Sequence, residues 1–241
     1  MGKDLKLEHE LIQQAYAKVA LFRDAQAKSK QTINYSAFSA YSKLAVANNL
    51  ALAAMCCGIS HSGSLSKREI TENDRNIATI IAHFVQSIDA VEICISNGMY
   101  AAASTLVRRN MEAVEACRGC FEGKQKEGRT PVLKALKHFG RLYGNFSGLA
   151  HNSGFTLMKH LSGSESASID PIENKEFGKI LLGVHIYCVL GISDALRYTH
   201  QGIHESRWLA DQRNFHQKSL DILIEERILI PSTDESLSNE A

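Results

Sequence analysis

Apolar side chains recur along most of this chain at the three- and four-residue spacing that is typical of α-helices. Thr71 to Asp74 offers capping residues at the start of the most regular segment, and Asn97-Gly98 is typical of a left-handed helix stop at its end. The pattern therefore predicts a helix between these two signals. The apolar stripe between them fits a 3.6-residue period and consists of Ile77, Ile80, Ile81, Phe84, Ile88, Val91 and Ile95.

Six more segments show helical spacing or helix boundaries, and no convincing strand or hairpin turn separates them. A Gly- and Ser-rich stretch at Gly58–Ser66 and a long stretch at 152–175 are predicted loops. Together these patterns predict an all-α, single-domain bundle of six or seven helices over residues 1–230, followed by a disordered acidic tail at 231–241. The six other helices are expected at about 4–30, 35–57, 99–122, 174–199 and 205–229, with one more starting at Thr130-Pro131 and ending near His151.

Three glycines lie at four-residue spacing in the helix that starts at Thr130-Pro131, namely Gly140, Gly144 and Gly148. Each costs a helix about 1 kcal/mol relative to alanine, so a row of them on one face suggests a packing reason. We expect another helix or a ligand to approach this backbone closely. On this basis we predict a homodimer that associates through the glycine-lined face.

Composition is that of an ordinary soluble protein: 44% of the residues are apolar, 22% are charged, and the formal net charge is +1. A balance this close to neutral gives no long-range attraction to nucleic acid, so RNA binding would require a local basic patch. The N-terminus is charged and lacks the apolar core of a signal peptide, and the apolar run Leu44–Ile59 is interrupted by two asparagines. The six cysteines lie mostly in apolar helical stretches. We therefore predict a reduced, cytoplasmic protein with no membrane contact.

The predicted helix at 99–122 has a polar face that carries Thr105, Arg108, Glu112 and Glu115. The four-residue spacing places Arg108 beside Glu112. One interpretation is a solvent-exposed intrahelical ion pair, which contributes only a few tenths of a kcal/mol. The other is a buried arginine whose planar fork of donors binds phosphate or carboxylate.

A second polar group of residues ends the predicted helix that contains the glycines. His151 closes this helix, and Tyr143 and Ser147 share its face at eight and four residues before it. A histidine at a helix C-terminus can simply complement the helix dipole. It can also act as a general acid or base, because imidazole titrates near neutral pH.

These two helices together resemble a family of bacterial helical proteins related to HEPN-type domains, the dimeric bundles of phage defence and toxin–antitoxin systems. The resemblance rests on Arg-x3-Glu at Arg108–Glu112, followed by Tyr-x3-Ser-x3-His at Tyr143–His151. It implies metal-independent RNA cleavage with no cofactor. The resemblance maps the family's arginine to Arg108 or Arg109, its glutamate to Glu112, and the second helix to Tyr143, Ser147 and His151. On this basis we predict His151, Arg108 and Glu112 as catalytic residues, with Arg109, Tyr143, Ser147 and Asn152 binding substrate.

The chain departs from the defining HEPN ribonuclease motif, in which four to six residues separate an arginine from a histidine. Arg141 and His151 have nine residues between them, and Arg197 and His204 have six, but Tyr198 follows the arginine where a polar residue is expected. Many HEPN-like proteins are also non-catalytic. A second hypothesis is therefore a non-enzymatic bundle that binds a partner protein or a small anionic ligand through the same residues.

Metal or redox sites are weaker alternatives. His200 and His204 have i,i+4 spacing, but Gly202 lies between them. Asp89 and Glu92 lie in an apolar helix, where they would more often be buried partners of an arginine. The single C-x-x-C sequence at 117–120 has no second cysteine pair. We therefore expect no metal site.

Overall fold

The structure is a computed structural model that describes residues 41–62, 70–125, 127–134, 136, 139–151, 173–199 and 207–230, together with a few isolated positions. All of the regular secondary structure in this part of the chain is helical, which confirms the predicted all-α class. The helices are α2 (Ser42–Ser62), α3 (Glu72–Ser96), α4 (Tyr100–Phe121), α5 (Gly140–Ala150), α7 (Lys175–Thr199) and α8 (Arg207–Glu225).

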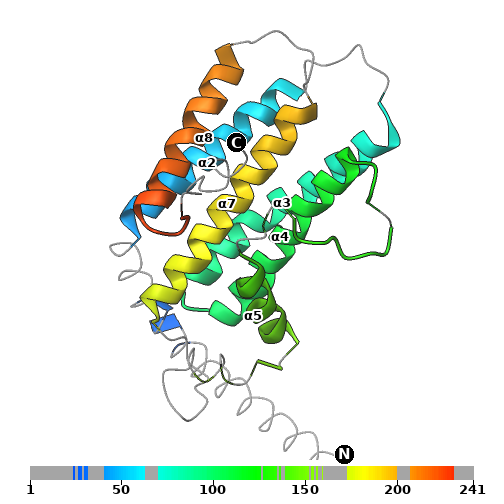
Figure 1. Ribbon diagram of the computed structural model, residues 1–241. Helices are drawn as coiled ribbons and strands as arrows, with labels where there is room; N and C mark the ends of the chain where they lie inside the picture. The colour runs from blue at the N-terminus through cyan, green and yellow to red at the C-terminus, as the bar shows by residue number, and fades with distance from the viewer. Residues whose placement is uncertain are drawn as a thin grey trace, which may run out of the picture.

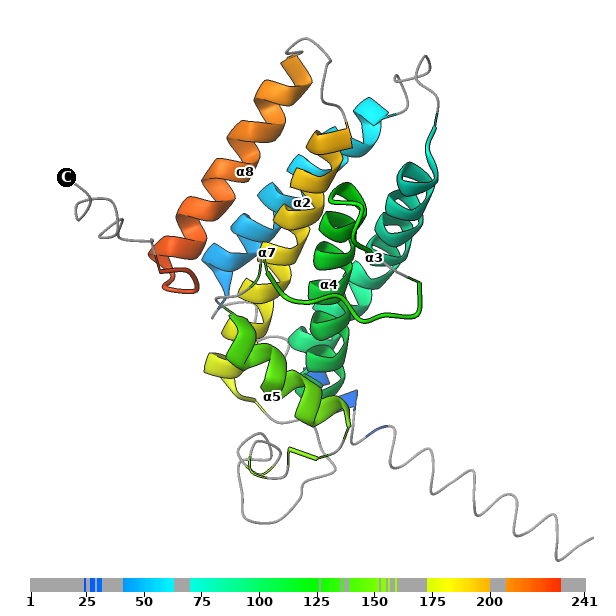
Figure 2. The same ribbon diagram turned by 45° about the vertical axis from the view of Figure 1, so that its right-hand side comes forward.

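Five long helices lie along one another, and the short helix α5 crosses one end of the bundle (Figures 1 and 2). Helix α7 lies in the middle and packs against α2, α3, α4 and α8. Helix α4 starts at the end of the bundle where α5 crosses and runs to the opposite end (Figures 1 and 2). Because α5 packs on α4, polar residues in the first half of α4 can meet those of α5.

One hydrophobic core joins the long helices, and the apolar stripes predicted from the sequence form it. The α3 stripe is confirmed, with six of its residues buried and Ile80 partly buried. Helix α7 is buried on almost every side, because neighbours surround it. Its fully or nearly fully buried residues include Leu181, Val184, Ile186, Cys188, Val189, Leu190 and Ile192.

The predicted start and stop of α3 are both confirmed. Thr71 and Asp74 form a reciprocal capping box, in which each side chain accepts a hydrogen bond from the other residue's backbone N–H. Gly98 follows the helix with φ of 69°, a left-handed conformation that glycine adopts without a steric penalty. The turn leads directly into α4 and fixes α3 and α4 as neighbours.

The predicted end of the second helix is wrong, because α2 continues past Gly58 to Ser62. A Cβ atom at Gly58 would lie 2.9 Å from the Cβ of Leu196 in α7. The glycine therefore allows close packing of α2 on α7 and does not end the helix. Packing overrides the local tendency of this sequence to form a loop.

The predicted start of the helix at Thr130-Pro131 is also wrong. Residues 131–133 are not helical, and α5 begins only at Gly140. The cause is Glu115, whose Oε1 accepts hydrogen bonds from the backbone N–H groups of Lys134 at 2.7 Å and Leu136 at 2.8 Å. Its side chain is only 4% exposed, so the prediction that Glu115 lies on an exposed face is wrong. A buried carboxylate thus holds the segment that leads into α5.

The row of glycines in α5 does not face another helix of this chain. A Cβ at Gly140 or Gly144 would meet no atom within 4 Å in the described structure, so the predicted close approach is wrong there within one chain. Of these three glycines, only Gly148 lies close to another part of the backbone. A Cβ atom at Gly148 would lie 3.5 Å from the Cα of Gly154. The predicted homodimer through this face stays a prediction.

Several other predictions also stay open. The helix at 4–30 and the loop at 152–175 lie mostly outside the described residues, and the tail at 231–241 lies entirely outside them. Helices α2, α3 and α7 are long and apolar enough to cross a membrane by length and composition alone. The two asparagines in the apolar run of α2 therefore do not exclude a membrane span, and the cytoplasmic location stays a prediction.

Candidate functional site

Helix α5 places its residues by an amphipathic pattern. Phe146 and Leu149 are buried on the inner face, and Phe139 is buried just before the first turn. Tyr143 is half-buried on the side next to α4, and His151 caps the C-terminal end of the helix, with its backbone N–H donating to the Ser147 carbonyl at 3.0 Å. The apolar anchors therefore fix Tyr143 and His151 above the first half of α4.

Arg108 of α4 connects the polar residues of both helices. Its Nη2 lies 3.1 Å from Glu112 Oε1, so the predicted i,i+4 ion pair is confirmed. Its Nη1 lies 3.4 Å from Nε2 of His151, a contact between residues 43 apart in the sequence. Its Cζ lies 5.3 Å from the centre of the Tyr143 ring, within the range of a cation–π interaction. The structure thus brings together four residues that the sequence singled out, which we call the Arg108 cluster: Arg108, Glu112, Tyr143 and His151.

The Arg108 cluster is linked internally but remains open to solvent. The Tyr143 hydroxyl donates to Glu112 Oε1 at 2.7 Å, the same oxygen that pairs with Arg108. The side chains of Arg108 and Glu112 are 20% and 25% exposed, and His151 is exposed. Within the described residues, the Nε of Arg108 is buried and has no hydrogen-bond partner. The exposed part of the Arg108 side chain therefore excludes Nε, and a ligand that enters this site can meet only the Nη end of the guanidinium.

The protonation states follow from these contacts. Hydrogen bonding with Tyr143, together with the charge of Glu112, raises the pKa of Arg108, and burial raises the pKa of Tyr143. At neutral pH the guanidinium is charged and the phenol is neutral. Because a guanidinium only donates, the His151 Nε2 that faces it can take part in a hydrogen bond only as the acceptor. The arrangement can hold an anion at Arg108 and offer His151 Nε2 as a proton acceptor beside it.

The structure does not bring all the predicted site residues together. Arg109 is exposed, and in the described structure no hydrogen bond or ion pair links it to the Arg108 cluster. Ser147 is half-buried on α5, and its backbone carbonyl accepts a hydrogen bond from the backbone N–H of His151. Asn152 lies outside the described residues. The site that can be described is therefore the four-residue Arg108 cluster.

Glu115 is a positioning residue that the sequence analysis assigned to the wrong face. It lies four residues after Met111 and eight after Val107, both of which are fully buried. That spacing could have placed its carboxylate on the core side of α4. By binding the amides of residues 134 and 136, Glu115 sets where the chain enters α5, and so where Tyr143 and His151 lie.

The weaker alternatives gain no support. Asp89 is exposed, and Glu92 accepts a hydrogen bond from Asn48 at 2.8 Å, so neither is a buried partner of arginine in the described structure. Both cysteines of the C-x-x-C sequence are buried and free, and burial raises the pKa of Cys117 to about 12. His200 and His204 lie outside the described residues, and no group of three potential metal ligands is found among those that are described.

Comparisons with models of protein families, with curated proteins and with solved structures find no match for this chain. The case for a function therefore rests on the Arg108 cluster and on the resemblance of its two motifs.

Proposed function

We propose that this protein is a HEPN-like, RNA-directed protein that cleaves RNA at the Arg108 cluster without using a metal ion. The observation that carries the proposal is the 3.4 Å contact between Arg108 Nη1 and His151 Nε2, which joins a cation and an imidazole from two different helices. As part of the same proposal, the protein is a cytoplasmic homodimer that acts in bacterial defence or stress.

The chemistry needs one group that stabilises charge on the phosphate and one that moves protons. Arg108 would bind the non-bridging oxygens of the scissile phosphate through its Nη atoms, one of which now faces Nε2 of His151. His151 would then accept the proton of the ribose 2′-hydroxyl. The 2′ oxygen forms a bond to phosphorus as the bond to the 5′ oxygen breaks, and the leaving 5′ oxygen takes up a proton from water. The products are a 2′,3′-cyclic phosphate and a 5′-hydroxyl end.

Glu112 and Tyr143 would position Arg108. Glu112 Oε1 lies 3.1 Å from Nη2 of Arg108, and the Tyr143 hydroxyl donates a hydrogen bond to the same oxygen at 2.7 Å. A guanidinium held from two sides loses less freedom when it binds phosphate.

One observation favours the second hypothesis, a binding site without catalysis. Arg108 and Tyr143 both bond to Glu112 Oε1, so the cluster already forms a mutually bonded polar network within the protein. A bundle that binds a small anionic ligand or a partner protein through the same cluster would keep this pair intact.

The test is cleavage of end-labelled RNA in EDTA by the full-length protein, its His151→Ala variant and a matched His83→Ala variant. His83 is exposed on α3, away from the cluster, and controls for the loss of one surface imidazole. We expect wild type and His83→Ala to cleave equally, and His151→Ala to be slower by about 100-fold or more, the usual contribution of a general acid or base.

Two outcomes would overturn the proposal. Equal cleavage by all three proteins would place the activity outside the cluster. No cleavage by a folded wild-type protein would support the binding hypothesis, and phosphate titration of wild type against Arg108→Ala would then test it.

A further inference from the structure

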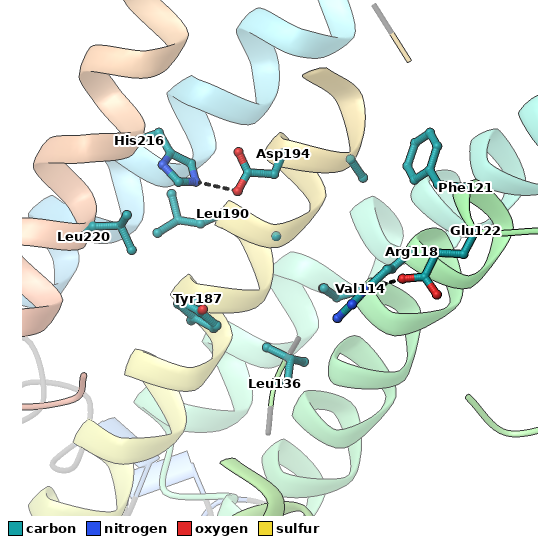
Figure 3. Close-up of a pocket in the computed structure, with 12 residues that line it drawn as sticks. Val114, Arg118, Phe121, Glu122, Leu136, Tyr187, Leu190, Asp194, His216 and Leu220 are labelled. Atoms are coloured by element: carbon teal, nitrogen blue, oxygen red, sulfur yellow. Dashed lines mark hydrogen bonds and ion pairs between the residues drawn. The ribbon is translucent and has the colours of Figure 1, made fainter. Parts of the chain in front are cut away.

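A second hollow lies at the other end of α4, away from the Arg108 cluster. It is a pocket of about 550 Å³ between α4, α7 and α8, within the size range of small-molecule sites (Figure 3). Helices α4 and α8 both pack on α7 and form opposite walls of the pocket. Its existence does not depend on the function proposed for the Arg108 cluster.

The body of this pocket is apolar. Val114, Leu136, Leu190 and Leu220 line it, and Tyr187 lies between Leu136 and Leu220 in the view of Figure 3. Gly191 contributes no side chain, and a Cβ there would lie 2.8 Å from Val114 Cγ1, so α4 and α7 touch at this level. An apolar ligand body would lie against all three helices.

Charged groups sit around the pocket, and each carboxylate already has cationic neighbours. Glu122 lies 2.8 Å from both Lys124 Nζ and Arg118 Nε, and these contacts lower its pKa to about 2. Asp194 Oδ1 accepts a hydrogen bond from Arg197 at 3.1 Å, and its Oδ2 lies 3.3 Å from His216 Nε2. Both carboxylates are therefore poor sites for a further cation.

The pocket itself is lined by one arginine, Arg118, and by the carboxylates of Glu122 and Asp194. Cations just outside the lining pair with both carboxylates, Lys124 with Glu122 and Arg197 with Asp194, so these two negative charges are already compensated without Arg118. A smaller adjoining hollow of about 220 Å³ shares Arg118 and adds two more cations, Arg129 and Lys134, with the buried Glu115. The charged edge of the pocket therefore favours an anionic group.

Arg118 is the side chain placed to meet that group. Its Nε binds Glu122, while its guanidinium points from α4 into the space between α4 and α7 (Figure 3). In the part of the chain that the structure describes, its two Nη atoms make no hydrogen bond. A guanidinium whose Nη edge is open can bind both oxygens of a carboxylate.

We propose that this pocket binds an amphipathic carboxylate, with its acidic head group on Arg118 and its apolar body among Val114, Leu136, Leu190 and Leu220. The site commits to this chemistry because it combines an apolar wall, one arginine whose Nη edge is open, and two carboxylates that neighbouring cations already neutralise.

The test is calorimetric titration of the full-length protein with decanoate, decanol and decylammonium. The variants are Arg118→Ala and, as a matched control, Arg75→Ala, which removes an exposed arginine that also pairs with a glutamate of its own helix. We expect decanoate to bind wild type and Arg75→Ala equally, and Arg118→Ala to bind it about tenfold more weakly or worse, the usual effect of losing a charge-assisted contact. Decylammonium should bind more weakly than decanoate.

A second variant, Leu220→Glu, places a carboxylate on the apolar wall and should abolish decanoate binding in a protein whose melting transition shows that it is folded. Failure of wild type to bind decanoate would overturn the proposal. So would equal affinity in Arg118→Ala, or binding of decylammonium as tight as that of decanoate.

Discussion

Helix α4 carries two arginine–glutamate pairs of the same spacing, and they lie in different surroundings. Arg108 and Glu112 are 20% and 25% exposed, under α5, and share contacts with Tyr143 and His151. Arg118 and Glu122 are 42% and 29% exposed, at the edge of an apolar pocket, and their additional partner is Lys124. The first pair is built into a network of two helices, whereas the second is a surface pair with an open guanidinium edge.

The difference shows that the i,i+4 pattern identifies a neighbour but not a role. An exposed pair of this kind contributes little to stability in either case. What gives Arg108 a chemical context is α5, which brings a phenol and an imidazole to it from residues more than thirty positions away. The chemical context of Arg118 is instead the apolar pocket that residues of α4, α7 and α8 line.

Glu115 lies between the two pairs, and its removal should have the largest effect on stability. We expect Glu115→Ala to lower the free energy of unfolding by about 2–4 kcal/mol, because it leaves two backbone donors without their charged acceptor. Denaturant unfolding measures this loss, with Glu122→Ala as the matched control that should unfold like wild type. If the two variants were equally stable, Glu115 would be a surface residue like Glu122, and α5 would not depend on it.

The pH dependence of folding has to be separated from that of the Arg108 cluster. His185 of α7 is fully buried, and burial lowers its pKa to about 4. Its nearest charged neighbour is Glu92 Oε1, at 4.0 Å from Nε2. Since the unfolded chain binds a proton near pH 6.5 and the folded chain does not, stability should fall as the pH drops from about 6.5 to 4, by roughly 3 kcal/mol in total.

Unfolding of a His185→Leu variant across this pH range checks the effect, because the variant should lose most of the pH dependence. An unchanged pH profile would show that other groups are responsible. The same variant should leave the pH profile of RNA cleavage unaltered, because His185 is not part of the Arg108 cluster.

We expect the smallest effect on stability from removal of the Tyr143 hydroxyl, which contacts the Arg108–Glu112 pair and has no counterpart at the Arg118–Glu122 pair described above. Tyr143→Phe removes the hydrogen bond to Glu112 and should lower the free energy of unfolding by about 1 kcal/mol. It should also weaken phosphate binding at Arg108, with decanoate binding at Arg118 unchanged. A variant that matches wild type in stability and in phosphate binding would contradict the positioning role of Tyr143.

The sequence predicts those helices whose boundaries and buried face are set by local signals, namely capping residues and apolar spacing. The stripe of α3, its Thr71 cap and its Gly98 stop are local signals, and the structure confirms them. Arg108, Glu112, Tyr143 and His151 were also identified, because helical spacing and the resemblance pointed to the same four residues.

The remaining features depend on contacts between distant residues. Thr130-Pro131 is a strong local start signal, yet Glu115 holds the following amides out of a helix. Gly58 looks like a helix end but lies inside α2, because Leu196 packs against it. Asp194 and His216 meet from two helices with no shared spacing, so no pattern could have placed them on one pocket.

The most direct measurement is a crossed comparison of Arg108→Ala and Arg118→Ala, each assayed for RNA cleavage in EDTA and for decanoate binding. We predict that Arg108→Ala loses cleavage by about 100-fold or more and binds decanoate like wild type, because loss of a charge-stabilising donor acts only at its own site. Arg118→Ala should cleave RNA like wild type and lose decanoate binding. If either variant lost both activities while remaining folded, or lost the one assigned to the other pair, the division of α4 into two separate sites would be wrong.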